Sequence, residues 1–127
     1  MGNTFPERAA SDSIRGELFQ HAADYGMRTV SISNNGVHLS AGPFEAAFEI
    51  GNFLGSSNVV SYDAGICNLW KVFAENNLAK ADFDRSMTNP AADIDGQSVD
   101  LFTYTEDMDT DAAVAAFADH FHGIGHG

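Results

Sequence analysis

The sequence predicts a single α+β domain over residues 1–127, in which a small antiparallel sheet is packed by three or more helices. Three observations support this fold class. The chain has 127 residues, of which 44% are hydrophobic and ten are phenylalanine, enough to build a buried core without disulfides or metals. Polar and apolar residues alternate on both sides of an Asn-Asn-Gly turn, and apolar residues recur at helical spacing in the middle and near the end of the chain.

The first elements are predicted close to the start of the sequence. Thr4 and Glu7 have the spacing of a capping box, in which each side chain bonds to a backbone N–H at the start of a helix, and Ser11–Ser13 is the alternative start. Apolar residues then recur every four positions from Ile14, which predicts the first helix at roughly 12–25. Gly26 can end that helix, because glycine readily adopts the left-handed conformation found after a helix.

A β-hairpin is predicted next. Polar and apolar residues alternate in Thr29–Ser33 and again in Val37–Ser40. The intervening Asn34-Asn35-Gly36 accepts the positive φ angles of a tight turn. Phe44–Ile50 places its apolar residues on one face if it is extended, so we expect a third strand there, with a helix as the alternative. The predicted sheet is therefore a hairpin plus a third strand.

Two later helices are predicted from continuous apolar stripes. The first is capped by Ser61 and ends at Asn76-Asn77. The second begins at Asp109 or Thr110 and stops near Gly123. The stripe residues expected to share one core with the hairpin are Ile66, Leu69, Trp70, Phe73, Val114, Phe117 and Phe121.

The stretch between these two helices is predicted to be less regular. Asn89-Pro90 and Asp95-Gly96 are typical of turns within residues 82–97. Ser98–Thr105 offers alternating apolar residues, which predict a short strand or an irregular edge.

The charge of the chain restricts its partners. Eighteen acidic residues accompany only six basic ones, for a net charge of -12. Direct binding of nucleic acid is not expected, because phosphate binding needs clustered Lys and Arg, and an anionic membrane would repel the chain.

No apolar run has the length of a membrane-spanning helix, and the polar stretch Met1–Ser13 lacks the apolar core of a secretory signal, so we expect a cytoplasmic protein of a bacterium or phage. The lone Cys67 is expected to be a buried thiol.

The acids concentrate in one segment, from Asp82 to Asp111, where Arg85 is the single basic residue. Such a concentration can imitate the phosphate charge of DNA and hold a DNA-binding enzyme by electrostatic complementarity. Adaptation to a salty cytoplasm is the alternative. The predicted partner-binding residues are Asp82, Asp84, Asp93, Asp95, Asp100, Glu106, Asp107, Asp109 and Asp111.

Metal-binding and catalytic patterns are weak in this sequence. His120 and His122 are weak metal candidates, with His126 further on, because ligands on a helix converge when they are three or four residues apart. The acidic runs that start at Asp93 and Asp107 lack the glycine and the final acid of an EF-hand loop. No motif of a serine hydrolase, a phosphate-binding loop or a zinc hydrolase occurs. We therefore expect no cofactor, no resident metal and no enzymatic activity.

The middle of the chain carries a more specific pattern. Ser33–Pro43, Phe48–Asn52 and Ser61–Ile66 resemble, in the same order, the core motifs of the ArdB/KlcA antirestriction family. In that family a strand pair surrounds a Leu-Ser-Asn-Gly-Gly-Phe-Tyr-Leu-Ala-Pro-like motif, and a helix opens with a Ser-Ala-Asp-Ala-Ala-Gly-Ile-like motif. Arg15-Gly16-Glu17 is similar to the family's first helix, so the resemblance covers roughly residues 14–78.

The resemblance implies a protein of a mobile element or phage that relieves type I restriction of incoming DNA and has no catalytic site. The residues that match the helix-opening motif are Asp63, Ala64, Gly65 and Ile66, for which helix capping and close packing are the simpler explanation. We therefore expect a non-enzymatic antirestriction protein that binds protein components, such as a restriction–modification complex. Two alternatives stay open: a small metal-binding, ligand-binding or enzymatic domain that uses His38, His120 and His122, and a salt-adapted acidic accessory protein.

Overall fold

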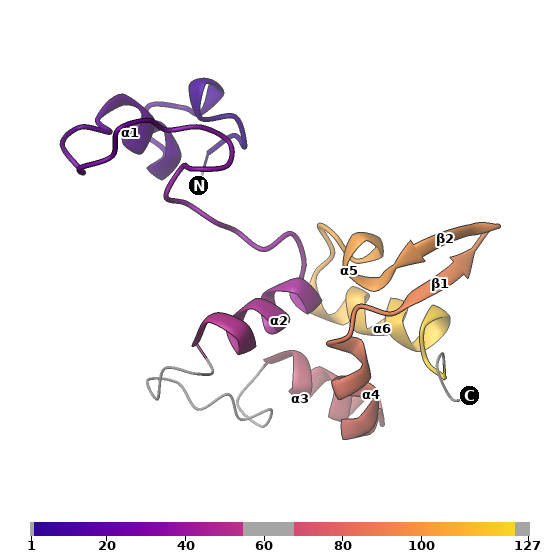
Figure 1. Ribbon diagram of the computed structural model, residues 1–127. Helices are drawn as coiled ribbons and strands as arrows, with labels where there is room; N and C mark the ends of the chain where they lie inside the picture. Colours follow the sequence, from indigo (N-terminus) through magenta and orange to yellow (C-terminus); the bar gives the residue numbers. More distant parts are fainter. Residues whose placement is uncertain (1, 55–67, 124–127) are drawn as a thin grey trace. The chain divides into compact units, whose positions relative to one another are not determined.

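The computed structural model describes residues 2–54 and 68–123 (Figure 1). The chain divides into two compact units, the N-terminal unit (Met1–Leu39) and the C-terminal unit (Ser40–Gly127). Helices and a small two-stranded antiparallel sheet give the described residues an α+β composition, in agreement with the predicted fold class. The single domain over 1–127 stays a prediction.

The N-terminal unit contains a short 3-10 helix, η1 (Pro6–Arg8), and one α-helix, α1 (Ile14–Gln20). Ser13 caps α1, because its side chain accepts a backbone hydrogen bond at 3.1 Å. The helix is shorter than the predicted 12–25. From His21 onward the backbone hydrogen bonds tighten to a spacing of three residues, and the chain continues as a series of turns.

The predicted capping box at the start of the chain is wrong. The short helix η1 follows Phe5, and no side chain caps it. Asn3, rather than Thr4, engages the backbone here, because its Oδ1 accepts the Phe5 N–H at 2.9 Å. Pro6 then supplies a φ angle suited to the first turn of a helix.

A buried arginine joins the separate segments of the N-terminal unit. The Arg15 side chain is only 7% exposed, and its Nη1 donates to the carbonyl oxygens of Gly2 at 2.7 Å and Asn3 at 2.8 Å. Its Nη2 donates to the carbonyl oxygen of Val37 at 3.3 Å. The residues of the described hydrophobic core all lie outside this unit. We call Arg15 and the three carbonyl groups that it binds the polar hub, and this hub connects the segments of the unit in place of an apolar core.

The predicted hairpin at Thr29–Ser40 is wrong, because these residues form only an isolated bridge between Ser31 and Asn34. The asparagines explain the difference. The Asn34 Nδ2 donates to the Thr29 carbonyl at 3.1 Å, and Asn35 both donates to a carbonyl at 2.7 Å and accepts a backbone N–H at 3.0 Å. Side-chain amides thus occupy backbone groups that a strand ladder needs.

The predicted third strand at 44–50 is also wrong, since this stretch lies in the helix α2 (Pro43–Leu54). Pro43 stands at the first helical position, where its missing N–H costs nothing. Among the side chains of this helix that the structure describes, Phe44 and Ala47, three residues apart, are the buried ones. Just before it, a Cβ on Gly42 would come within 2.6 Å of the Thr105 carbonyl oxygen, so only glycine fits this approach.

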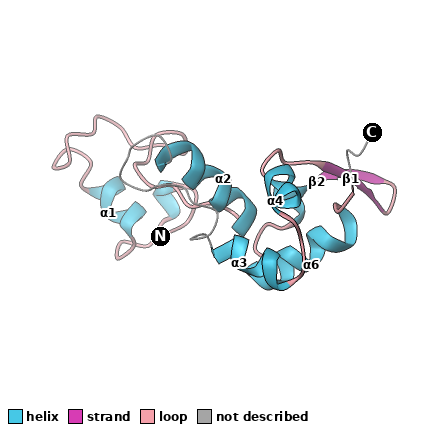
Figure 2. Ribbon diagram, turned by 90° about the horizontal axis from the view of Figure 1, so that it is seen from below, coloured by secondary structure: helices cyan, strands magenta, loops and turns pink. Residues whose placement is uncertain are grey.

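The C-terminal unit is built mainly from helices, with the two strands as a hairpin beside them (Figure 2). After α2 come α3 (Asn68–Glu75), α4 (Lys80–Ser86), β1 (Ala91–Ile94), β2 (Gln97–Asp100), α5 (Leu101–Tyr104) and α6 (Thr110–His120).

The sheet of the structure lies in the stretch after α4, where the Asp95-Gly96 turn is confirmed and the expected short strand within Ser98–Thr105 is confirmed for the residues that belong to β2. β1 and β2 pair antiparallel, with Ala91 opposite Asp100 and Ile94 opposite Gln97. Asp95 and Gly96 connect them with φ angles of 54° and 78°. Two positive φ angles in a two-residue loop match the right-handed twist of a hairpin, which is why Asp-Gly favours this turn.

The core of the C-terminal unit consists of aromatic and aliphatic side chains from α2, α3, α4, β1, α5 and α6, and from the residue that directly follows α6. Its buried members are Phe44, Ala47, Leu69, Val72, Phe73, Phe83, Ala92, Leu101, Ala113, Val114, Phe117 and Phe121. Phe117 is central, because its ring centroid lies 5.1 Å from that of Phe73 and 5.8 Å from that of Phe44.

The shared core of the two striped helices is confirmed for Leu69, Phe73, Val114, Phe117 and Phe121, while Trp70 packs against it only partly buried. Its predicted packing against a hairpin at 29–40 is wrong, because no residue of that stretch belongs to the described core. The predicted start of the first striped helix at Ser61, together with Ile66 and Cys67, lies outside the described residues. Its end at Asn76-Asn77 is confirmed by the φ of 57° at Asn77. The last helix is confirmed as well: Asp109 caps α6, and Gly123 follows it with a φ of 86°.

Candidate functional site

The segment from Asp82 to Asp111 begins with a carboxylate that does not face outward. Asp82 is only 8% exposed. Its Oδ1 accepts a hydrogen bond from Arg85 at 3.0 Å, and its Oδ2 accepts the Ala79 N–H at 3.0 Å, at the start of α4. Because this residue holds its own helix, the structure corrects its assignment to a partner-facing surface.

Two further acids of the segment form an ion pair or hydrogen bonds with residues close to them in the sequence. Asp84 forms an exposed ion pair with Lys80 one turn away, at 2.6 and 2.8 Å. Asp100 caps α5, because one oxygen accepts the Thr103 N–H at 3.0 Å and the other accepts the Thr103 hydroxyl at 2.9 Å. The Thr103 N–H is the main reason why the pKa of Asp100 lies below its ordinary value.

The remaining acids are exposed, and they lie in β1 and the β1–β2 turn, in the segment between α5 and α6, and in the first turn of α6. Asp93 accepts the Gly96 N–H at 3.0 Å across the turn, and Asp109 accepts the Ala112 N–H at 2.9 Å at the start of α6. Asp107 has a φ of 61°, a conformation that Asp and Asn tolerate better than most residues. We call these exposed acids the acidic surface: Asp93, Asp95, Glu106, Asp107, Asp109 and Asp111.

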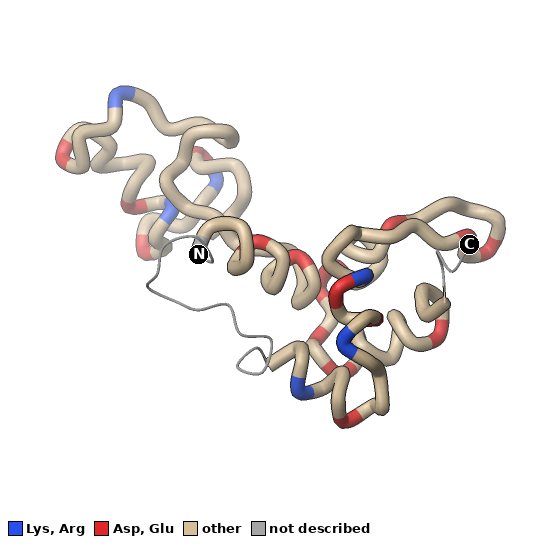
Figure 3. The backbone as a smooth tube through the Cα atoms, turned by 60° about the horizontal axis from the view of Figure 1, so that its bottom comes forward, with Lys and Arg blue, Asp and Glu red and all other residues tan. Residues whose placement is uncertain are grey.

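The acidic surface belongs to a part of the sequence without basic side chains. From Ser86 to Gly127 there is no Lys or Arg, although the acids there number eight with Asp100 and Asp119 included. Acidic positions recur over the C-terminal unit in Figure 3, including the turn of the hairpin. Local hydrogen bonds explain why several of these residues are Asp, but they leave the negative charge unneutralised.

The histidines near the end of the chain have separate surroundings. The His120 ring packs edge-on against Tyr104 with centroids 5.3 Å apart. The Nε2 of His122 lies 3.5 Å from the Oδ1 of Asp82. Within residues 2–54 and 68–123, no three side chains of His, Cys, Asp or Glu are grouped so that they can hold a metal ion. His126 lies outside those ranges, and His38 is exposed in the N-terminal unit.

The residues that carry the family resemblance are only partly visible. Asp63, Ala64, Gly65 and Ile66 lie outside the described residues. The strand pair that the resemblance implies around Ser33–Pro43 is replaced there by loops and the start of α2.

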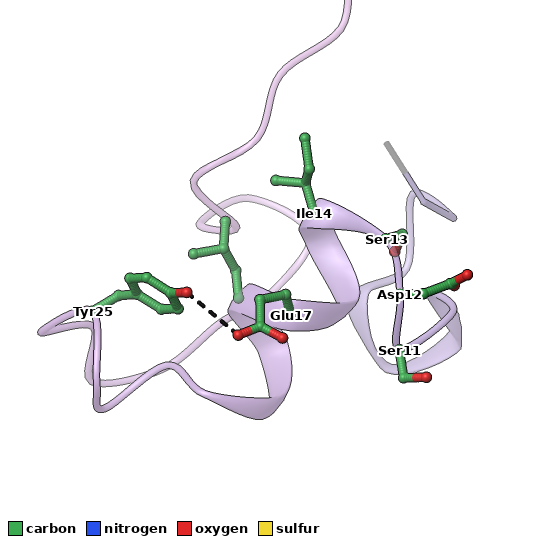
Figure 4. Close-up of a pocket in the computed structure, with 7 residues that line it drawn as sticks. Ser11, Asp12, Ser13, Ile14, Glu17 and Tyr25 are labelled. Carbon is green, nitrogen blue, oxygen red and sulfur yellow. Dashed lines mark hydrogen bonds between the residues drawn. The ribbon is translucent and has the colours of Figure 1, made fainter.

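Sequence reasoning missed a hollow on the surface of the N-terminal unit. It has a volume of about 460 Å³ and lies along one face of α1 (Figure 4). Its lining residues are Ser11, Asp12, Ser13, Ile14, Glu17, Leu18 and Tyr25. The spacing of Ile14, Glu17 and Leu18 at i, i+3 and i+4 was the available signal, because these positions share a helix face.

Searches of protein-family models, curated proteins and solved structures found no match to this chain. Among the described residues, no helix has the length and apolar character needed to cross a bilayer.

Proposed function

We propose that this chain is a non-enzymatic antirestriction protein of the bacterial cytoplasm, which binds a protein component of a type I restriction–modification complex through its acidic surface. The observation that carries the proposal is the acidic surface itself, which is exposed and belongs to a stretch free of Lys and Arg. The ordered resemblance to the ArdB/KlcA motifs supplies the biological setting.

The physical argument rests on the cost of keeping like charges together. Exposed carboxylates repel one another, and the repulsion lowers stability unless a positive surface or a high salt concentration offsets it. A DNA-binding enzyme presents such a positive surface, because it must hold phosphates with clustered Lys and Arg. The acidic surface can therefore occupy the DNA-binding face of a restriction complex by charge complementarity.

Replacing Asp93, Asp95, Asp107 and Asp109 together with Asn tests the proposal with little disturbance of the fold. Asn keeps the side-chain oxygen that bonds across the turn and at the α6 cap, and it tolerates the positive φ angles. We expect this four-Asn variant to lose protection of unmodified plasmid DNA in a transformation assay with a type I restricting host. Its stability should equal or slightly exceed that of the parent.

A matched control removes the same number of charges from other exposed positions. Its substitutions are Glu7→Gln, Asp24→Asn, Glu75→Gln and Asp119→Asn. The control should protect plasmid DNA as well as the parent does. Full protection by the four-Asn variant would refute the charge-based mechanism.

Salt separates binding from halophilic adaptation. Binding to a purified restriction complex should weaken as ionic strength rises, because exposed charges are screened over about 10 Å at 0.1 M salt. Salt adaptation instead predicts that added salt raises the unfolding temperature and that no complex forms. That second result, together with unchanged restriction in the presence of the protein, would contradict the proposal.

A further inference from the structure

The hollow along α1, which we call the α1 hollow, lies entirely within the N-terminal unit. Its apolar wall is widely exposed, since Ile14 is 61% and Tyr25 56% accessible. Ligand pockets for free small molecules usually enclose most of the ligand. A hollow with such open walls therefore fits a side chain that belongs to the surface of a partner protein better than it fits a free small molecule.

The polar part of the α1 hollow is acidic. The Tyr25 hydroxyl donates to the Oε1 of Glu17 at 3.3 Å, and the two side chains point toward each other in Figure 4. The negative charge of Glu17 is the main reason why the pKa of Tyr25 lies above its ordinary value. Asp12 adds a second carboxylate, and none of the lining residues is Lys or Arg.

We propose that the α1 hollow is a docking site for an arginine side chain that a partner protein presents next to an apolar residue. The apolar neighbour and the arginine methylenes pack on Ile14 and Leu18, and the guanidinium donates to the Glu17 carboxylate. The planar guanidinium also stacks on the exposed Tyr25 ring, which a compact lysine ammonium does less well. The site is independent of the acidic surface and goes beyond the function proposed above.

A peptide titration of the full chain tests this site. The probe is acetyl-Leu-Arg-Leu-amide, and its matched control carries citrulline, an uncharged analogue of arginine of similar shape. In amide NMR spectra, the arginine peptide should shift the resonances of Ile14, Leu18 and Tyr25. The citrulline peptide should bind about tenfold more weakly, because hydrogen bonds between charged groups are the stronger ones.

The pKa of Tyr25 gives a second readout. A bound guanidinium offsets the charge of Glu17, so the pKa of Tyr25 should fall toward its ordinary value when the arginine peptide is present. An NMR titration that follows the ring resonances of Tyr25 measures this shift separately from the other two tyrosines of the chain. An unchanged pKa at saturating peptide would count against the docking geometry.

Variants complete the test. Glu17→Gln should weaken binding of the arginine peptide about tenfold, and Ile14→Ser should weaken it by removing the apolar wall. Glu7→Gln makes the same charge change on η1, outside the hollow, and should bind as the parent does. Equal binding of both peptides, full affinity in Glu17→Gln, or shifts confined to the acidic surface would each overturn the proposal. None of these results depends on the transformation assay.

Discussion

The N-terminal and C-terminal units reach order by different means. The described core of twelve apolar residues lies wholly in the C-terminal unit, whereas the N-terminal unit relies on the buried Arg15 and leaves Ile14 and Leu39 more than half exposed. Their charges differ as well: four acids accompany three arginines before Ser40, a net charge of -1, so -11 of the total of -12 belongs to the C-terminal unit. The repulsion between like charges is therefore greatest in the C-terminal unit, where burial of the apolar core supplies stability that offsets it.

The polar hub of the N-terminal unit is also incomplete. The Nε of Arg15 is buried and has no hydrogen-bond partner among the described residues. A buried donor without a partner costs free energy, while apolar burial contributes with every contact. We therefore expect the N-terminal unit to open locally more often than the C-terminal unit.

The largest expected effect is on the aromatic core. Phe117→Ala removes a fully buried ring that contacts Phe44 and Phe73. The free energy of unfolding of the C-terminal unit should fall by about 3–5 kcal/mol. Chemical denaturation followed by Trp70 fluorescence measures this loss. Ile14→Ala, in the exposed wall of the α1 hollow, is the comparison and should change stability little; equal losses in both variants would erase the contrast between the units.

An intermediate effect is expected at the polar hub. Arg15→Met keeps much of the apolar stem but leaves the carbonyls of Gly2, Asn3 and Val37 without their donors. The free energy of local opening around α1 should fall by ~1–3 kcal/mol, measured by hydrogen exchange of the α1 amides. Amides of α6 should keep their protection. A loss of protection shared by α1 and α6 would show that the two units do not open separately.

The smallest effect concerns pH and Asp100. Its pKa is lowered in the folded chain, so its charge contributes stability above the unfolded value near 3.8, and this contribution is lost as the pH falls through the lower folded pKa. Asp100→Asn keeps an oxygen for the cap but cannot titrate. At neutral pH the parent should be more stable than this variant by roughly 0.3–1 kcal/mol, and the difference should vanish in acid. Unfolding curves at several pH values measure it, and a constant difference would contradict the cap.

The elements that the sequence predicted well are those in which local and tertiary preferences agree. In α6, Asp109 supplies the cap, while Val114 and Phe117 fall on the face that the core requires. The hairpin at 29–40 failed because alternation describes side chains, whereas Asn34 and Asn35 decide where the backbone hydrogen bonds go.

The stretch 44–50 was ambiguous for a geometric reason. Phe44 and Phe48 are four residues apart, so they share a face both in a strand and in a helix. Ala47, which is buried, distinguishes the two, because it joins Phe44 only in a helix.

The candidate site was predictable in composition but not in arrangement. The sequence locates the acidic segment, yet the burial of Asp82 depends on α4 beginning at Lys80 and on Arg85 lying one turn later. The α1 hollow depends on Tyr25 approaching Glu17 through the turns after α1, and no periodic pattern describes those turns.

The close approach of Gly42 to the Thr105 carbonyl limits which residues position 42 can accept as the sequence changes. Any side chain there collides with the Thr105 carbonyl, in the segment that joins α5 to α6. The same segment carries Asp107, whose N–H donates to the Ala41 carbonyl at 2.9 Å. The exposed side chain of Glu106 in this segment can be exchanged for other polar side chains without moving the backbone, whereas Gly42 cannot be replaced. In a saturation mutagenesis library selected for folding, position 42 should retain glycine almost alone, beside neighbours that accept many residues.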